Sequence, residues 1–314
     1  MPDPMIRAEG LTRRFGELTA VDGLSFEVRP GELFGLVGPD GAGKTTTLRM
    51  LAGVLRPTSG DALVAGVSMA RHPESAKPRI AYMSQRFGLY TDLTVQENLA
   101  FYADLHRVPR AERAARFERL YRFSNLGPFK DRLAGKLSGG MKQKLGLSCA
   151  LIHQPEILLL DEPTFGVDPI SRRDLWRIVH ERVGQGTTAV VSTAYMDEAE
   201  RFDRLVLLHR GRVLAVDTPE SLQRGYAGEV LEIPVDRPRE ALETVRHHPA
   251  ARRAALFGEH LHLTVDDAAT AGPALSGALS QAGFRPGEAR RILPSLEDVF
   301  IERIASADEQ EAAA

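Results

Sequence analysis

The sequence reads Gly38-Pro39-Asp40-Gly41-Ala42-Gly43-Lys44-Thr45-Thr46 at the point that decides its fold. An apolar run of strand length, Leu33 to Val37, comes directly before it, as expected for a strand covered on both faces. A helical pattern follows, in which apolar side chains recur at the spacing of one helix face: Leu48, Leu51, Ala52 and Leu55. The glycine-rich stretch therefore joins a buried strand to a helix N-terminus, which predicts an α/β fold with a mainly parallel sheet.

This stretch matches the P-loop pattern, in the strand-loop-helix context that the pattern requires. Glycines let backbone N–H groups close around phosphate oxygens, and the helix N-terminus favours negative charge. We predict that the stretch binds the phosphates of a nucleoside triphosphate, that Lys44 reaches the β and γ phosphates, and that Thr45 offers its hydroxyl to Mg²⁺. The alternative is a glycine-rich turn that merely connects two elements, which the flanking strand and helix disfavour.

Two carboxylates, Asp161 and Glu162, follow a second apolar run, Ile157 to Leu160. In parallel sheets, ligands bind at the edge formed by the carboxyl ends of the strands. We predict that Asp161 holds the magnesium ion and that Glu162 orients or activates the attacking water. Taken alone, such a pair is more often a solvated turn, and the P-loop upstream reverses that preference.

A third motif, Leu137-Ser138-Gly139-Gly140-Met141-Lys142-Gln143, lies before the carboxylate strand. Together with the P-loop, it resembles the signature of ATP-binding-cassette (ABC) ATPases, and the resemblance covers about Ile6 to Tyr226. It implies a P-loop ABC cassette with a mainly parallel sheet, an antiparallel N-terminal subdomain and a helical insertion. Taken alone, Ser-Gly-Gly would be an ordinary helix N-cap.

The resemblance assigns further roles at the nucleotide. It implies that the ligand is MgATP and that Glu162 and Lys44 are catalytic. Phe15 occupies the place of the aromatic residue that stacks on adenine. Gln85 is similar to the family's magnesium-contacting glutamine.

In the family, two cassettes pack head to tail, so the signature of one closes over the ATP of the other. The resemblance therefore implies a second cassette as partner, in a homodimer or a heterodimer. Ser138, Gly139 and Gly140 would contact the partner's ATP. Asp168, in Phe165-Gly166-Val167-Asp168, would lie in the loop that crosses between the two ATPase subunits.

Three segments resemble ATPases of bacterial drug-type exporters: Gln85-Arg86-Phe87-Gly88-Leu89-Tyr90, Leu93-Thr94-Val95-Gln96-Glu97-Asn98-Leu99 and Pro294-Ser295-Leu296-Glu297-Asp298-Val299-Phe300. The resemblance implies an ATPase subunit that powers a separate integral membrane permease and exports drug-like or other small molecules. Two alternatives stay open: a regulatory nucleotide-binding cassette with little hydrolysis, and a non-transport ABC ATPase. The short distance from Lys44 to Ser138 disfavours the long insertion of DNA-repair members.

Composition limits the partners. The net charge of −2 predicts no nucleic-acid partner, because proteins that bind the phosphate backbone normally carry a basic excess. One cysteine, Cys149, fits a reducing compartment. No run approaches the ~18 apolar residues that span a bilayer. We therefore expect a cytoplasmic protein, attached to the inner face of the cell membrane through the permease.

The predicted domains are an ABC ATPase domain over residues 1–226, with a helical subdomain at about 90–155, and a C-terminal accessory domain over 227–305. The accessory domain has an α+β pattern, with strand-like runs at Val230 to Val235 and Leu261 to Val265. Residues 306–314 are predicted to form a disordered tail.

Two positions depart from the family pattern. Ala194 aligns with a histidine that contacts the γ phosphate, and a methyl group cannot make that contact. We expect ATP binding to survive and hydrolysis to be slower, or to be supported by a different group. Asp40 replaces the usual asparagine; since the loop N–H groups and Lys44 bind the phosphates, its effect is expected to be modest.

Overall fold

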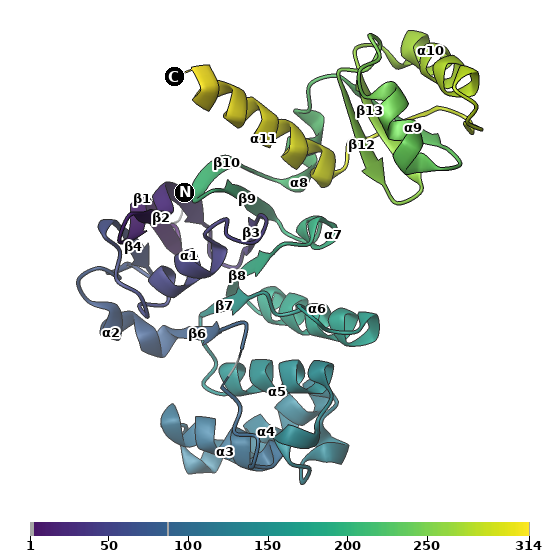
Figure 1. Ribbon diagram of the computed structural model, residues 1–314. Helices are drawn as coiled ribbons and strands as arrows, with labels where there is room; N and C mark the ends of the chain where they lie inside the picture. Colours follow the sequence, from purple (N-terminus) through teal and green to yellow (C-terminus); the bar gives the residue numbers. More distant parts are fainter. Residues whose placement is uncertain (1–2, 87, 314) are drawn as a thin grey trace. The chain divides into compact units, whose positions relative to one another are not determined.

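The computed structural model describes residues 3–86 and 88–313, with side chains up to residue 309. Phe87, part of the exporter-type motif, lies outside the described residues. The chain divides into two compact units, Met1–Thr218 and Pro219–Ala314. Figure 1 shows the elements of each unit along the chain.

The first unit contains two sheets. The antiparallel sheet has the order β2-β1-β4-β5 and consists of β1 (Ile6–Phe15), β2 (Leu18–Val28), β4 (Ser59–Val64) and β5 (Val67–Ser68). The larger sheet has the order β10-β9-β3-β8-β7-β6 and consists of β3 (Leu33–Val37), β6 (Ile80–Met83), β7 (Ile157–Asp161), β8 (Thr188–Thr193), β9 (Arg204–His209) and β10 (Arg212–Asp217). Only β10 is antiparallel to its neighbour in this sheet. The predicted mainly parallel sheet and antiparallel N-terminal subdomain are confirmed.

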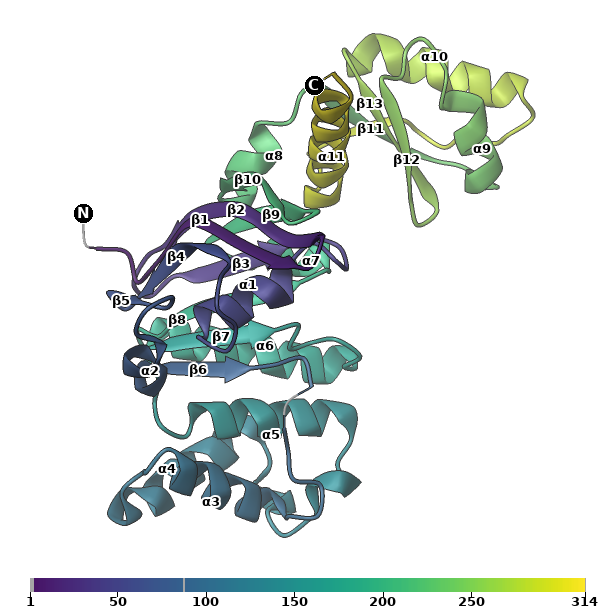
Figure 2. The ribbon, with the colours of Figure 1, turned by 60° about the vertical axis from the view of Figure 1, so that its left-hand side comes forward.

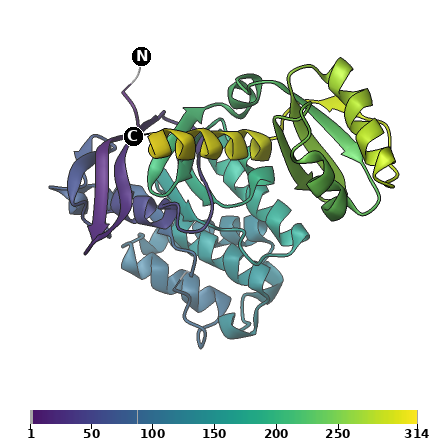
Figure 3. The ribbon, with the colours of Figure 1, turned by 45° about the horizontal axis from the view of Figure 1, so that its top comes forward.

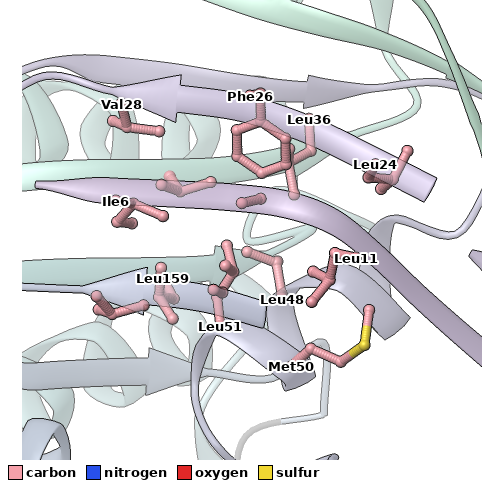
Figure 4. Packing of buried hydrophobic residues seen from close by; sticks show 14 of the residues in the cluster. Ile6, Leu11, Leu24, Phe26, Val28, Leu36, Leu48, Met50, Leu51 and Leu159 are labelled. Carbon is pink, nitrogen blue, oxygen red and sulfur yellow. The ribbon is translucent and has the colours of Figure 1, made fainter. Parts of the chain in front are cut away.

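Helix α1 (Lys44–Leu51), which begins at the P-loop lysine, lies between the two sheets (Figure 2). Its buried side chains Leu48 and Leu51 belong to one hydrophobic core with Ile6 of β1 and Leu159 of β7 (Figure 4). Burying one leucine side chain contributes about 1.5–3 kcal/mol. Because the core packs on the helix from both sheets, it holds the N-terminus of α1 at the carboxyl edge of the parallel strands.

A helical insertion follows β6. It contains α3 (Val95–Leu105), α4 (Arg110–Ser124) and α5 (Gly139–Leu151), and α3 and α4 lie beyond α5 from the sheet (Figures 1 and 2). A capping box starts α3, since Thr94 Oγ1 accepts the Glu97 N–H (3.2 Å) and Glu97 Oε2 accepts the Thr94 N–H (2.8 Å). Among the described residues of this unit, the other α-helices are α2 (Pro73–Ala76), α6 (Pro169–Gly184) and α7 (Met196–Ala199).

Two stacked imidazoles join α3 to the end of α5. The ring centroids of His106 and His153 lie 3.9 Å apart, and His153 Nε2 lies 3.2 Å from the Ile80 carbonyl oxygen. Burial, and secondarily the neighbouring His106, lowers the pKa of His153 to about 4. Burial also lowers the pKa of His106. Both rings are therefore neutral at pH 7.

This pair predicts acid sensitivity. The unfolded chain protonates these histidines near pH 6.5, whereas the folded chain resists protonation of His153 down to about pH 4. The unfolded state thus binds more protons in this window, so the free energy of unfolding should fall as the pH drops from about 6.5 to 4. Urea denaturation at pH 7 and pH 5 measures the loss. Between pH 7 and pH 5, His153→Gln should lose less of its free energy of unfolding than the wild type. His72 is exposed, so His72→Gln is the control. Equal losses in the wild type and His153→Gln would contradict the prediction.

The second unit has an α+β fold. Its antiparallel sheet has the order β12-β13-β11-β14 and consists of β11 (Glu229–Pro234), β12 (Arg253–Phe257), β13 (His260–Val265) and β14 (Arg290–Ile292). Helices α9 (Pro238–Val245) and α10 (Ala268–Gln281) pack on this sheet and share its core, which includes Leu231, Leu261 and Leu275. Two more helices, α8 (Pro219–Arg224) and α11 (Leu296–Ala313), contact each other.

The structure differs from the sequence prediction near the ends of this unit. The first domain was predicted to extend to residue 226, whereas the first unit ends at Thr218 and helix α8 belongs to the second unit. Residues 306–313, predicted to be disordered, continue α11, which Figure 3 shows in yellow as one unbroken helix. Alanine, glutamate and glutamine are strong helix formers, so the helix extends beyond its packed part. In the part of the chain that the structure describes, the helices are too short or too polar to cross a membrane.

Candidate functional site

The loop between β3 and α1 is so closely surrounded that glycine is required at two positions. A Cβ atom on Gly38 would lie 2.3 Å from the Leu208 carbonyl oxygen. A Cβ atom on Gly43, whose φ is 97°, would lie 2.6 Å from the Ala20 carbonyl oxygen. Both clashes are with backbone, which cannot move aside as a flexible side chain can. The glycines of the motif therefore have a structural cause in this chain.

Lys44 is the first residue of α1, and its ammonium group is almost completely buried. Its Nζ atom donates to the carbonyl oxygens of Gly38 (2.8 Å) and Pro39 (3.0 Å) and lies 3.1 Å from Glu162 Oε1. With side-chain exposures of 4% and 11%, Lys44 and Glu162 form a buried ion pair. The two residues predicted to be catalytic therefore lie in direct contact.

Asp161, the last residue of β7, is 1% exposed and accepts three hydroxyl hydrogen bonds. Thr45 Oγ1 (2.9 Å) and Ser192 Oγ (2.8 Å) donate to Oδ1, and the Tyr82 hydroxyl (3.3 Å) donates to Oδ2. Burial, followed by the Asp161 charge, raises the pKa of Tyr82 to about 12, so this hydroxyl keeps its proton. Three donors therefore stabilise the buried carboxylate.

The oxygen atoms at this edge suit Mg²⁺, a hard cation that prefers hydroxyl, carboxylate and amide oxygens. Of the three predicted metal ligands, Thr45 and Asp161 are in contact. The third, Gln85, donates its Nε2–H to Glu162 Oε2 (2.9 Å) and lines the same cavity as Thr45. The chemistry of this set of residues fits the predicted ion.

Glu162 has an unusual backbone conformation. Its φ of 47° lies in the left-handed region, which costs a residue with a side chain about 1–2 kcal/mol. Its N–H donates to Ser192 Oγ (3.0 Å), and its carbonyl oxygen accepts the Phe165 N–H (3.1 Å). Such strain is concentrated at functional sites, where surrounding bonds hold it. Here the resulting turn places the carboxylate against Lys44 and Gln85.

A cavity of about 440 Å³ opens over the P-loop. Its lining consists of Leu18, Thr19, Ala20, Asp40, Gly41, Ala42, Gly43, Lys44, Thr45, Thr46, Gln85, Glu162 and Arg210. Sequence reasoning missed Arg210, which lies in the turn from β9 to β10 and belongs to no motif. The turn is tied to the P-loop because the Gly211 N–H donates to the Ala42 carbonyl oxygen (3.2 Å).

Phe15, predicted to stack on adenine, is not among the residues lining this cavity. It ends β1 and is 45% exposed, and the Arg13 guanidinium lies over its ring, 4.5 Å from the centroid. The residues of the antiparallel sheet that do line the cavity come from the start of β2. Adenine stacking on Phe15 therefore stays a prediction.

The signature motif starts helix α5 next to the predicted crossing loop of the same chain. Ser138 is the N-cap residue and accepts the Met141 N–H (3.3 Å). A Cβ atom on Gly140 would lie 2.4 Å from Ser171 Cβ and 3.1 Å from Asp168 Oδ2. Asp168 caps α6 by accepting the Ser171 N–H (2.9 Å), and this hydrogen bond lowers its pKa. Ser138 and Gly139 are exposed.

Ala194 directly follows β8 and is exposed. The two residues before it belong to the site, because Ser192 contacts Asp161 and the Thr193 carbonyl oxygen accepts the Gly38 N–H (3.3 Å). Position 194 therefore lies at the same sheet edge as the P-loop. It presents a methyl group, which neither donates nor accepts a hydrogen bond.

This chain is similar to known proteins in sequence and in fold. The family model described as "ABC transporter" matches residues 21–165. The protein named "Probable multidrug ABC transporter ATP-binding protein YbhF" of Escherichia coli (strain K12) is 42% identical, with 99% of this chain and 54% of that protein covered. This chain thus spans about half the length of that relative.

A second relative matches along most of its length. "Daunorubicin resistance ATP-binding protein DrrA2" of Streptomyces coeruleorubidus is 36% identical, with 94% of both chains covered. A solved structure described as "Structure of ATP binding subunit of ABC transporter" is 31% identical at a TM-score of 0.64, covering 70% of this chain and 92% of that one. Motifs, fold and relatives agree, and this chain belongs to the family of ABC transporter ATP-binding proteins.

Proposed function

We propose that this chain binds MgATP over the P-loop and hydrolyses it. The observation that carries the proposal is the contact between Lys44 and Glu162 at the carboxyl edge of the parallel sheet, beside the Thr45–Asp161 pair. A phosphate-binding cation, a base and a set of metal ligands are the groups that phosphoryl transfer to water requires.

The contacts indicate how these residues would act. An incoming phosphate competes with Glu162 for the Lys44 ammonium, since both are anions. Once released, Glu162 can accept a proton from the attacking water, and Gln85 holds its carboxylate in place through the 2.9 Å hydrogen bond. Thr45, Asp161 and Gln85 would hold Mg²⁺, which neutralises charge on the phosphates.

A second cassette is proposed to complete the site. Ser138 begins a helix, and a helix N-terminus favours an anion. Two large apolar side chains are exposed here, Phe165 in the crossing loop at 56% and Ile170 just after it at 68%. A partner cassette would cover them and receive Ser138, Gly139 and Asp168 at its own ATP. Whether that partner is a second copy of this chain is an outcome of the experiment below.

The other partner is proposed to be an integral membrane permease at the inner face of the cell membrane. An aromatic pair on the helical insertion supports this: Tyr90 is 47% exposed, Phe101 is 36% exposed, and their rings meet edge to face at 4.5 Å. The relatives named for multidrug transport and daunorubicin resistance support drug-like or other small molecules as cargo.

The decisive experiment isolates the tagged chain from its own cells and identifies the proteins that co-purify. We expect a multi-spanning membrane protein, a stoichiometry of two cassettes, and ATP turnover by the complex. Recovery with ribosomes or DNA would favour the non-transport alternative. A complex that dimerises on ATP without turnover would favour the regulatory cassette.

A further inference from the structure

Glu198, on the short helix α7, is a buried carboxylate with no part in the steps above. It is 1% exposed and accepts three hydrogen bonds. Oε2 accepts the hydroxyls of Thr193 (2.8 Å) and Thr164 (3.0 Å), and Oε1 accepts the Trp176 Nε1–H (3.1 Å). One side chain therefore joins residues from three different segments of the first unit.

Two of these segments carry the proposed chemistry. Thr164 lies in the turn that Glu162 opens, which is closed by the hydrogen bond from the Phe165 N–H to the Glu162 carbonyl oxygen. Thr193 lies immediately before Ala194, and its carbonyl oxygen accepts the N–H of Gly38. Through two hydroxyls, the Glu198 carboxylate thus connects the base, the loop after β8 and the start of the P-loop.

The charge of Glu198 is costly where it stands. Burying a carboxylate destabilises the folded state unless its partners are well placed, and an apolar side chain at the same position is often at least as stabilising. The Arg172 guanidinium lies beside it, with Nε 3.6 Å from Oε1. Packing alone therefore does not explain a carboxylate at this position. The need for one acceptor that binds two threonine hydroxyls does explain it.

We propose that Glu198 is a positioning residue for ATP hydrolysis, which fixes the turn containing Glu162 against the loop containing Ala194. This inference rests on the proposed ATPase activity. It is specific to Oε2, the atom that both threonine hydroxyls share. Lys44 and Gln85 hold the Glu162 carboxylate itself, and the Glu198 link holds the backbone turn that carries it.

Glu198→Gln tests the proposal at constant side-chain size. A glutamine has one acceptor oxygen and one NH₂ donor in place of two acceptor oxygens. With its NH₂ at Trp176, donor meets donor; with its NH₂ at the threonines, both hydroxyls lose their shared acceptor and must turn round to accept instead. We expect kcat for ATP to fall about 10-fold, because a small displacement of a catalytic group costs that much or more, with the KM for ATP unchanged. Glu32→Gln is the matched control: Glu32 is 6% exposed and paired with Arg204, but it precedes β3 at the opposite end from the P-loop.

Thr164→Val is the second variant, which removes one hydroxyl and keeps the side-chain shape. It should reproduce the loss of kcat, and the double variant with Glu198→Gln should be no slower than Glu198→Gln alone. An unchanged kcat in both single variants overturns the inference, as does an equal loss in Glu32→Gln.

A readout that needs no turnover separates this inference from the proposed activity. Trp176 is the single tryptophan of the chain, and its indole is bound to Glu198. ATP should change its fluorescence in wild type and not in Glu198→Gln. If the wild type binds ATP without hydrolysing it, the proposed ATPase activity fails. The fluorescence still tests the link in that case: loss of the response in Glu198→Gln supports the link, and a response that is kept in Glu198→Gln overturns it.

Discussion

Glu162→Gln is expected to lower ATP turnover by about 10²- to 10⁴-fold, the usual contribution of a positioned general base. Glutamine keeps the size of the side chain but cannot take a proton from water. ATP binding should survive or tighten, because the variant no longer offers a carboxylate to Lys44, which is then left for the phosphates. Steady-state turnover measures the loss of hydrolysis, and ATP-dependent dimerisation of the same preparation measures whether ATP still binds.

Glu156→Gln is the matched control for this variant. Glu156 precedes the same strand, β7, at its other end, where it forms two hydrogen bonds with Arg79 (2.7 and 2.6 Å). Its loss removes a carboxylate and an ion pair from that strand without touching the P-loop edge. A Glu162→Gln protein that turns over ATP at the wild-type rate would remove Glu162 from the proposed role.

The sequence predicted the centre of the fold well, for identifiable reasons. A strand at Leu33–Val37 and a helix just after the glycines follow from an apolar run of strand length and a helix-spaced pattern, and both signals are local. Other elements lack such a signal. Strand β12 reads Arg-Ala-Ala-Leu-Phe, without alternation or β-branched residues, and it exists because β13 pairs with it.

In the site, too, local sequence motifs predicted some features, and tertiary structure determines the others. Motifs named Lys44, Asp161 and Glu162, but not the left-handed turn at Glu162, which neighbouring strands impose. Arg210 belongs to no motif and enters the cavity lining through a hairpin turn. The three partners of Glu198 are brought together by tertiary structure alone, so no spacing in the sequence indicates that they meet.

Ala194→His is expected to raise ATP turnover by up to about 100-fold, the scale of one positioned polar contact to a transition state. The backbone is already in place, since Ser192 and Thr193 bind Asp161 and the P-loop. An imidazole at this exposed position adds a hydrogen-bonding group where the methyl group offers none. Turnover of Ala194→His at saturating ATP measures the gain, and Ala194→Leu controls for added bulk. An unchanged or lower rate would show that hydrolysis here is supported by a different group.

Combining this variant with Glu162→Gln tells which step the imidazole assists. If the histidine positions the attacking water, it raises ATP turnover only when Glu162 can deprotonate that water. The gain in turnover should then disappear in the Glu162→Gln background. A gain that persists there would mean that the histidine acts on the phosphate alone or takes the proton itself. If the gain disappears, the slow hydrolysis expected of the wild type follows from an attacking water that is not held in position. The base itself is in place, because Glu162 contacts Lys44 in this chain. The double variant therefore separates a missing contact from a missing base, two defects that turnover of the wild type alone does not distinguish.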